Sequence, residues 1–137
     1  MKFNAITPEL LQTFGAIVGP EHVLLPAAAE DMLRYTHDET EDLRYEPEVV
    51  LKPANAEEIS RIMQVCSENL IPVTPRGAGT GLSGGALAIH QGVILSTERL
   101  NRILQIEERN LQAPVEPGVI TQVFQEAVIE RRLYYPP

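Results

Sequence analysis

Apolar residues recur at helical spacing in several stretches of the chain. The first follows Thr7, which can cap a helix N-terminus, and lies between Pro8, which suits the first turn of a helix, and Gly19, a frequent helix terminator. The second follows Asn55, a residue suited to cap a helix N-terminus, and the third begins at Thr121. A shorter helical stretch is expected near residues 27–35. The pattern therefore predicts four helices.

Short apolar runs bounded by proline, glycine and polar residues predict β-strands at residues 49–51, 71–74 and 93–96. Two further runs, 103–106 and 112–115, flank a polar turn and predict a hairpin. The order is strand, helix, strand, long loop, three more strands and a helix. This order predicts an α+β fold built as a small α/β subdomain.

The composition is that of a folded domain, with 137 residues of which 44% are apolar and 22% charged. No apolar run is long enough to cross a bilayer, and the N-terminus lacks a signal peptide, so we expect a cytoplasmic protein without a transmembrane segment. Cys66 is the only cysteine, which excludes an internal disulfide and predicts a buried thiol on a helix face. The apolar end, residues 134–137, indicates a fragment of a longer protein.

The net charge of −8 has the wrong sign for a protein that binds phosphate backbones, so nucleic acid is excluded as a partner. Residues 30–48 carry −6 of this charge. Such a run is typical of a solvated connecting loop, and the alternative is a docking surface for a basic partner. His37 lies within it without the spacing of metal ligands, so no metal site is predicted.

The candidate chemistry lies in residues 75–85, which hold five of the nine glycines directly after a predicted strand. Closely spaced glycines let successive main-chain N–H groups form an anion-binding nest, which a pyrophosphate would fit. The hydroxyls of Thr80 and Ser83 add donors, and Arg76 offers charge or a fork of N–H groups. The alternative is a flexible surface loop.

Two common phosphate-binding motifs do not fit this loop. The Walker motif requires a Gly-Lys-Ser/Thr sequence, and the only lysines are Lys2 and Lys52. Residues 79–84 match the GxGxxG pattern of dinucleotide-binding folds, but no helix-length periodic segment follows before residue 93. The loop therefore requires another phosphate-binding fold.

The run from Glu48 through Pro53, the following helix and the loop of residues 71–85 together resemble the FAD-binding domain of the vanillyl-alcohol oxidase superfamily. The resemblance continues through residues 92–96, 100–103 and 115–119, and is strongest to the group of glycolate oxidase FAD-linked subunits and D-lactate dehydrogenases. It implies an N-terminal helical extension with an acidic loop at residues 1–47. Residues 48–137 would be the first half of a two-subdomain FAD-binding domain, incomplete at its C-terminus.

The resemblance also implies which residues bind FAD. These are Pro75, Arg76, Gly77, Ala78, Gly79, Thr80, Gly81, Leu82, Ser83, Gly84, Glu116, Gly118 and Pro137. A bend after a strand explains Gly118 equally well. Members that attach FAD covalently through this loop carry a histidine where this chain has Thr80, so we expect noncovalent FAD.

The implied reaction is hydride transfer from a small 2-hydroxy acid, of the glycolate or D-lactate type, to FAD. The groups that would bind and deprotonate the substrate lie beyond residue 137 in the family, so no catalytic residue is predicted in this chain. Other glycolate oxidase subunits are candidate partners. The alternatives are a flavoenzyme of the same superfamily with another substrate, or a non-catalytic module that binds a nucleotide or a partner protein.

Overall fold

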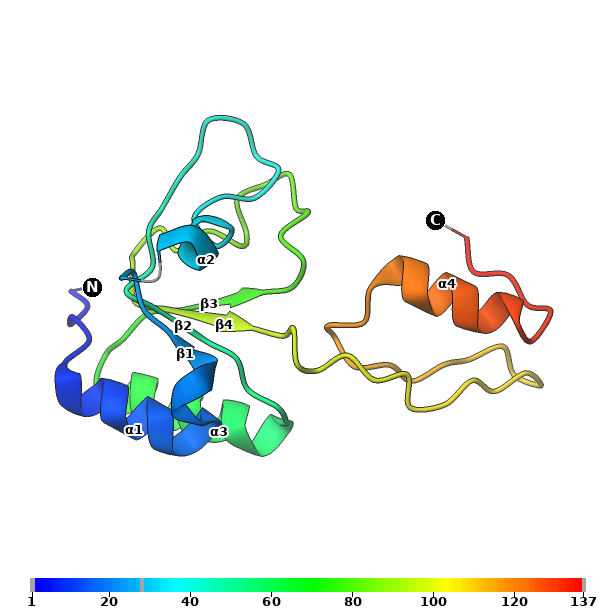
Figure 1. Cartoon of the computed structure of the whole chain (residues 1–137), viewed down its shortest axis with the longest axis horizontal. Coiled ribbons are helices and arrows are strands. Elements are labelled where there is room, and N and C mark those ends of the chain that lie inside the picture. Colours follow the sequence, from blue (N-terminus) through cyan, green and yellow to red (C-terminus); the bar gives the residue numbers. More distant parts are fainter. Residues whose placement is uncertain (1, 28, 137) are drawn as a thin grey trace.

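The computed structural model describes residues 2–27 and 29–136 and divides visibly into two parts (Figure 1). The larger part is a four-stranded sheet with helices on both faces. After the last strand the chain leaves the sheet and forms a smaller lobe, in which a long hairpin-like excursion runs beside the final helix. The predicted α+β class is confirmed.

The sheet places three parallel strands side by side. Its order is β1 (Val23–Leu24), β2 (Val49–Leu51), β4 (Val93–Ser96) and β3 (Val73–Arg76). β2 and β3 both pair in parallel with β4, whereas β1 pairs antiparallel with β2. The carboxyl ends of β2, β4 and β3 therefore lie at one edge of the sheet, which is where ligands of such sheets bind.

Helices bury both faces of the sheet, which is why β2 and β4 are apolar without alternation. Helices α1 (Pro8–Val18) and α3 (Ala56–Glu68) cover one face, and α2 (Ala29–Leu33) lies over the other (Figure 1). Val49 and Leu51 pack in the first core, whereas Val50 packs in the second with Tyr35 and Ile94. Cys66 is buried in the first core, as predicted.

The predicted caps of the two long helices are confirmed. The Thr7 hydroxyl accepts a hydrogen bond from the N–H of Leu10 at 3.3 Å. The side chain of Asn55 accepts from the N–H of Glu58 at 2.9 Å, and the Glu58 carboxylate accepts from the N–H of Ala54 at 2.7 Å. Both helix N-termini thus have side-chain acceptors for otherwise unpaired donors.

The second predicted strand begins two residues later than expected, at Val73. The reason is the end of α3, where Leu70 takes a φ of 55° and the N–H of Ile71 donates to the carbonyl of Cys66 at 2.8 Å. This bond belongs to a helix-terminating motif, so Ile71 is not available to the sheet. The short strand β1 and the 3-10 helix η1 (Pro20–His22) were not predicted.

The two arms of the predicted hairpin are joined by two isolated β-bridges, Ile103 with Val115 and Glu107 with Gln112. The prediction of two regular strands at residues 103–106 and 112–115 is therefore wrong. The last predicted helix is confirmed as α4 (Thr121–Ile129). An apolar cavity of about 550 Å³ lies between the hairpin and α4, where Phe124 and Tyr135 stack edge to face. Within the described residues, no helix is both long and apolar enough to span a membrane.

Candidate cofactor-binding site

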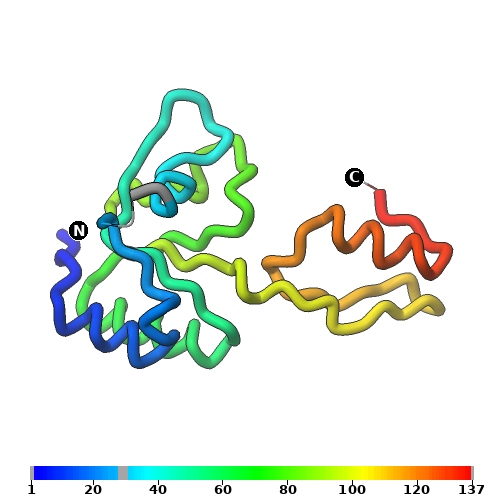
Figure 2. The backbone as a smooth tube through the Cα atoms, in the orientation of Figure 1, coloured from blue at the N-terminus to red at the C-terminus, as the bar shows by residue number. Residues whose placement is uncertain are grey.

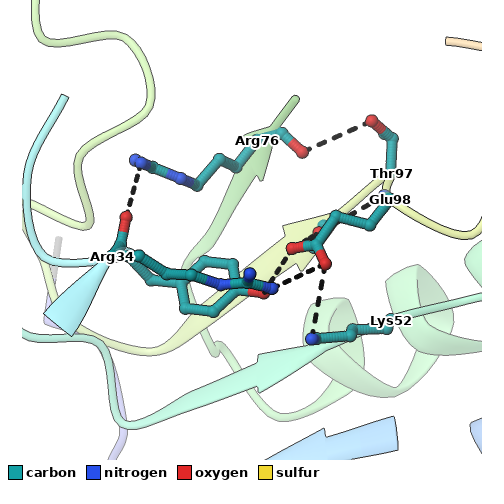
Figure 3. Close-up of polar contacts among 7 residues, drawn as sticks. Arg34, Lys52, Arg76, Thr97 and Glu98 are labelled. Atoms are coloured by element: carbon teal, nitrogen blue, oxygen red, sulfur yellow. Dashed lines mark hydrogen bonds and ion pairs between the residues drawn. The ribbon is translucent and has the colours of Figure 1, made fainter. Parts of the chain in front are cut away.

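The carboxyl ends of β3 and β4 border a cavity of about 250 Å³ at the sheet edge. It is lined by Arg34, Tyr35, Arg76, Gly77, Ala78 and Glu98. The glycine-rich loop, residues 77–85, leaves β3 at this point, and Glu98 follows β4 two residues after Ser96. Lys52, directly after β2, reaches the same place (Figure 3). Three strand ends therefore converge on one site.

The main chain of the loop presents a row of hydrogen-bond donors. Among the described residues, no acceptor is found for the N–H groups of residues 78–83, and most of this segment is exposed. The hydroxyls of Thr80 and Ser83 also have no partner in the described part of the chain, and Leu82 is 75% exposed. Unpaired main-chain N–H groups in an exposed turn of this kind can donate hydrogen bonds to a bound anion.

The loop is anchored at its start by the side chain of Arg76, which is only 6% exposed. One terminal nitrogen donates to the carbonyl oxygens of Arg34 and His37, both at 2.7 Å, and the other to Ala86 at 3.3 Å. The fork of N–H groups is thus directed at main-chain carbonyls. Burial lowers the pKa of Arg76, and the charge of Asp38 opposes that effect.

Gly79 is glycine for two structural reasons. Its φ is +77°, and a Cβ placed there would lie 2.2 Å from the terminal nitrogen of Arg76. Gly84, with a φ of +70°, donates its N–H to the Thr40 hydroxyl at 2.8 Å. Gly77 and Gly85 differ, because a Cβ at Gly77 meets nothing closer than 3.9 Å and one at Gly85 meets nothing within 4 Å. The glycine content therefore reflects packing at some positions and openness at others.

On the other side of the cavity, Glu98 is the shared hydrogen-bond acceptor of several polar side chains (Figure 3). Its carboxylate accepts hydrogen bonds from Arg34 at 2.7 Å, Ser96 at 3.0 Å, Lys52 at 3.4 Å and the Tyr35 hydroxyl. Burial disfavours its ionised form, but these hydrogen bonds and charges outweigh burial and lower its pKa.

The cluster of Glu98 with Arg34, Tyr35 and Lys52 was not predicted from the sequence. Tyr35 is 2% exposed, and the charged groups of Arg34, Lys52 and Arg76 lie 4.8, 5.5 and 5.8 Å from its ring centre. The signal that could have found Lys52 and Glu98 is their position directly after predicted parallel strands. Arg34 and Tyr35 belong to the segment after α2, which carries no comparable signal.

The remaining predicted site residues do not line this cavity. Pro75 is exposed within β3, and Glu116 is paired with Arg102, whose nitrogen lies 2.6 Å from the carboxylate. Hydrogen bonds from Arg102 lower the pKa of Glu116. A Cβ at Gly118 would lie 2.1 Å from the carbonyl oxygen of Thr97, so the packing of this bend requires glycine. Pro137 lies outside the described residues.

The acidic segment does more than connect α2 to the sheet. Residues 41–46 are exposed, as expected of a solvated loop, but Thr36 and Asp38 are buried, and Asp38 lies beside the glycine-rich loop. Figure 2 shows the two segments on the same side of the sheet, and the Gly84 N–H donates to the Thr40 hydroxyl between them. The described residues contain no cluster of three or more His, Cys, Asp or Glu side chains placed to bind a metal ion.

The curated relatives of this chain are named as an oxidase subunit and a dehydrogenase. It is 39% identical over 132 residues to "Glycolate oxidase subunit GlcD" of Bacillus subtilis, covering 96% of this chain and 28% of that protein. It is 35% identical over 137 residues to "D-lactate dehydrogenase" of Anaerostipes hadrus, covering 99% of this chain and 28% of that protein. The chain thus spans little more than a quarter of these relatives.

Solved structures share the fold at low sequence identity. The substrate complex of p-cresol methylhydroxylase superposes with a TM-score of 0.78 at 24% identity, over 90% of this chain and 24% of that one. An alkyldihydroxyacetonephosphate synthase gives 0.77 at 15% identity, over 96% and 27%. The family model described as "FAD binding domain" matches residues 47–137, which confirms the predicted resemblance to an FAD-binding domain, and this chain belongs to that FAD-binding domain family.

Proposed function

We propose that this chain is the pyrophosphate-binding part of a flavin-dependent oxidoreductase that converts a 2-hydroxy acid to the 2-oxo acid. Residues 75–84 hold the FAD pyrophosphate, with Glu116, Gly118 and Pro137 as further cofactor contacts. The observation that carries the proposal is the row of unpaired main-chain N–H groups at residues 78–83, beside a cavity where three parallel strands end.

The charges around the loop suit a dianionic pyrophosphate. Arg34, Lys52 and Arg76 lie around the cavity, whereas the acids are Glu98, which lines it, and Asp38, which borders the loop, so the local balance is still positive in a chain of net charge −8. Main-chain donors held in place before the ligand arrives lose little freedom on binding. The residues present therefore fit the diphosphate of FAD.

FAD is held without a covalent bond in this proposal. Residues 75–85 contain no histidine, cysteine or tyrosine, the side chains through which a protein nucleophile could attach to flavin. The loop instead offers main-chain N–H groups and the hydroxyls of Thr80 and Ser83. These groups bind an anion and leave the isoalloxazine ring unattached.

The substrate class rests on the relatives, whose names are glycolate oxidase subunit and D-lactate dehydrogenase. The residues of this chain would bind and orient FAD, which would supply the acceptor for the hydride of the substrate carbon. Other oxidase subunits are proposed partners because one relative is named as a subunit. We retain the division into an extension at residues 1–47 and a subdomain at 48–137, which the family match from residue 47 supports. A cytoplasmic location fits the single buried, unpaired Cys66.

The first test uses the complete natural protein that carries these 137 residues, called here the complete protein. After purification we expect the two-banded visible spectrum of oxidised flavin, FAD released into the supernatant by acid precipitation, and bleaching by glycolate or D-lactate without oxygen. Flavin retained in the precipitate would contradict noncovalent binding. Bound FAD that no 2-hydroxy acid reduces would favour another substrate, and a protein without affinity for FAD would overturn the proposal.

A paired substitution tests the loop itself. Gly77→Val adds a side chain that the fold accommodates but that projects where a phosphate must approach the main chain. Gly85→Val adds the same side chain, also without a clash, at a position that does not line the cavity. We expect Gly77→Val to weaken FAD binding about tenfold or more, the equivalent of one lost charged hydrogen bond. Gly85→Val should bind FAD as the natural protein does. Equal affinity of the two variants would place the pyrophosphate elsewhere.

A further inference from the structure

The start of the acidic segment, residues 34–40, is attached to both ends of the glycine-rich loop. At the first end, the Arg76 side chain donates to the carbonyl oxygens of Arg34 and His37. At the second end, the Gly84 N–H donates to the Thr40 hydroxyl. The loop between these points has no comparable bonds to the rest of the described chain. Residues 34–40 therefore form the support on which the loop is held.

Asp38 lies at the centre of this support and is 6% exposed. One carboxylate oxygen, Oδ1, accepts a hydrogen bond from the N–H of Thr40 at 2.9 Å. The other, Oδ2, is buried with no hydrogen-bond partner among the described residues. It faces the loop, because a Cβ placed on Gly81 would lie 4.0 Å from it. A buried carboxylate oxygen with an unused acceptor site thus borders the middle of the loop.

Leaving a buried acceptor unpaired is costly, so its retention requires a compensating interaction. The N–H of Thr40 is the largest influence that lowers the pKa of Asp38, and the Thr40 hydroxyl, the N–H of Ala86 and the charge of Arg76 act in the same direction. In turn, the negative charge of Asp38 is the largest of the charge effects that favour the ionised form of Arg76. The buried charges of Asp38 and Arg76 therefore stabilise each other's ionised form, although the two side chains form no direct ion pair.

We propose that Asp38 is a positioning residue for the cofactor-binding loop. Through Thr40 it fixes the Gly84 end, and its carboxylate holds residues 34–40 against the loop, so that the N–H groups of residues 78–83 remain free for the pyrophosphate. Asp38 acts through the loop, because its negative charge would repel a diphosphate that touched it directly. This inference rests on the proposed function in that it assumes a diphosphate ligand.

The test compares two changes with two matched controls in the complete protein. Asp38→Asn removes the negative charge and replaces one of the two carboxylate oxygens, Oδ1 or Oδ2, by an NH2 group that can only donate. Thr40→Val removes the hydroxyl that accepts from the N–H of Gly84. Glu39→Gln removes the same charge from an exposed neighbour, and Thr40→Ser keeps the hydroxyl. The readouts are the FAD dissociation constant and hydrogen exchange of peptides covering residues 77–86, with peptides of α3 and β4 as references.

We expect Asp38→Asn and Thr40→Val to raise the FAD dissociation constant about tenfold or more and to accelerate exchange in residues 77–86 only. Glu39→Gln and Thr40→Ser should stay within about twofold of the natural protein. Asp38→Asn that behaves like Glu39→Gln would overturn the inference, as would exchange that rises equally in α3 and β4. If the natural protein binds no FAD, the proposed function fails, and the exchange of the loop still decides the role of Asp38.

Discussion

Replacing Gly79 by alanine should destabilise the fold even in the absence of cofactor. The residue has a φ of +77°, and an added Cβ would lie 2.2 Å from the terminal nitrogen and 2.7 Å from the central carbon of the Arg76 guanidinium. That guanidinium is buried and makes three hydrogen bonds to main-chain carbonyls. The alanine methyl therefore cannot be accommodated unless Arg76 moves and gives up some of these bonds.

The expected magnitude combines two contributions. An alanine in the left-handed region costs about 1–2 kcal/mol relative to glycine. Losing a hydrogen bond of a buried charged group costs about 1.5–3 kcal/mol. Because the loop can relax in part, we expect a loss of about 3 kcal/mol in the free energy of opening this region. That loss corresponds to a population of the open state roughly a hundredfold larger.

Hydrogen exchange at the amides of β3 and β4 measures this quantity in the complete protein without cofactor, because their exchange requires the region to open. Gly79→Ala should accelerate exchange there by roughly a hundredfold. Gly85→Ala is the matched control, since its φ is not positive and a Cβ there meets nothing within 4 Å. If the two variants exchange at the same rate, the packing of Gly79 against Arg76 is not what holds the loop.

Three further predictions concern residues outside the loop. Burial raises the pKa of Cys66 to about 11, so a thiol reagent at mildly alkaline pH should label it only after unfolding, and rapid labelling of the native protein would contradict its burial. Gly15→Ala, with no atom closer than 3.9 Å to the new Cβ, should stabilise α1 by about 0.5–1 kcal/mol in urea denaturation, whereas Gly118→Ala should destabilise because its Cβ meets the Thr97 carbonyl oxygen. The pKa of Glu98 is lowered on folding, so its contribution is present at neutral pH and lost as the pH falls through that pKa; Glu98→Gln should therefore flatten the acid side of the stability profile, and an unchanged profile would refute this.

The elements that the sequence predicted best are those fixed by local chemistry. Thr7 and Asn55 cap α1 and α3 as expected, because a side-chain acceptor, the first-turn N–H groups and an apolar face lie within a few residues of one another. The strands β2 and β4 are apolar runs with clear boundaries. By contrast, β1 has two residues and exists only because it pairs with β2, which is a tertiary contact.

The site was predictable only in part for the same reason. Closely spaced glycines after a strand identify a loop that can present main-chain donors, and the structure has such donors at residues 78–83. What the pattern cannot specify is the partner of each side chain. Arg76 was expected to offer charge or N–H groups to a phosphate, yet its fork is directed at carbonyls some 40 residues earlier in the chain, at Arg34 and His37.

The acidic segment shows how composition can conceal a local role. Residues 41–46 fit the expectation of a solvated loop, but Asp38 and Thr40 lie within the same run and contact the glycine-rich loop. An anion-binding loop needs N–H groups that stay unpaired before the ligand binds, and a loop free of internal bonds must be held from outside. In this chain that external support comes from residues 34–40, which precede β2 and lie outside the matched family region of residues 47–137. A chain shortened to the family match should therefore retain the loop sequence but lose the contacts that order it.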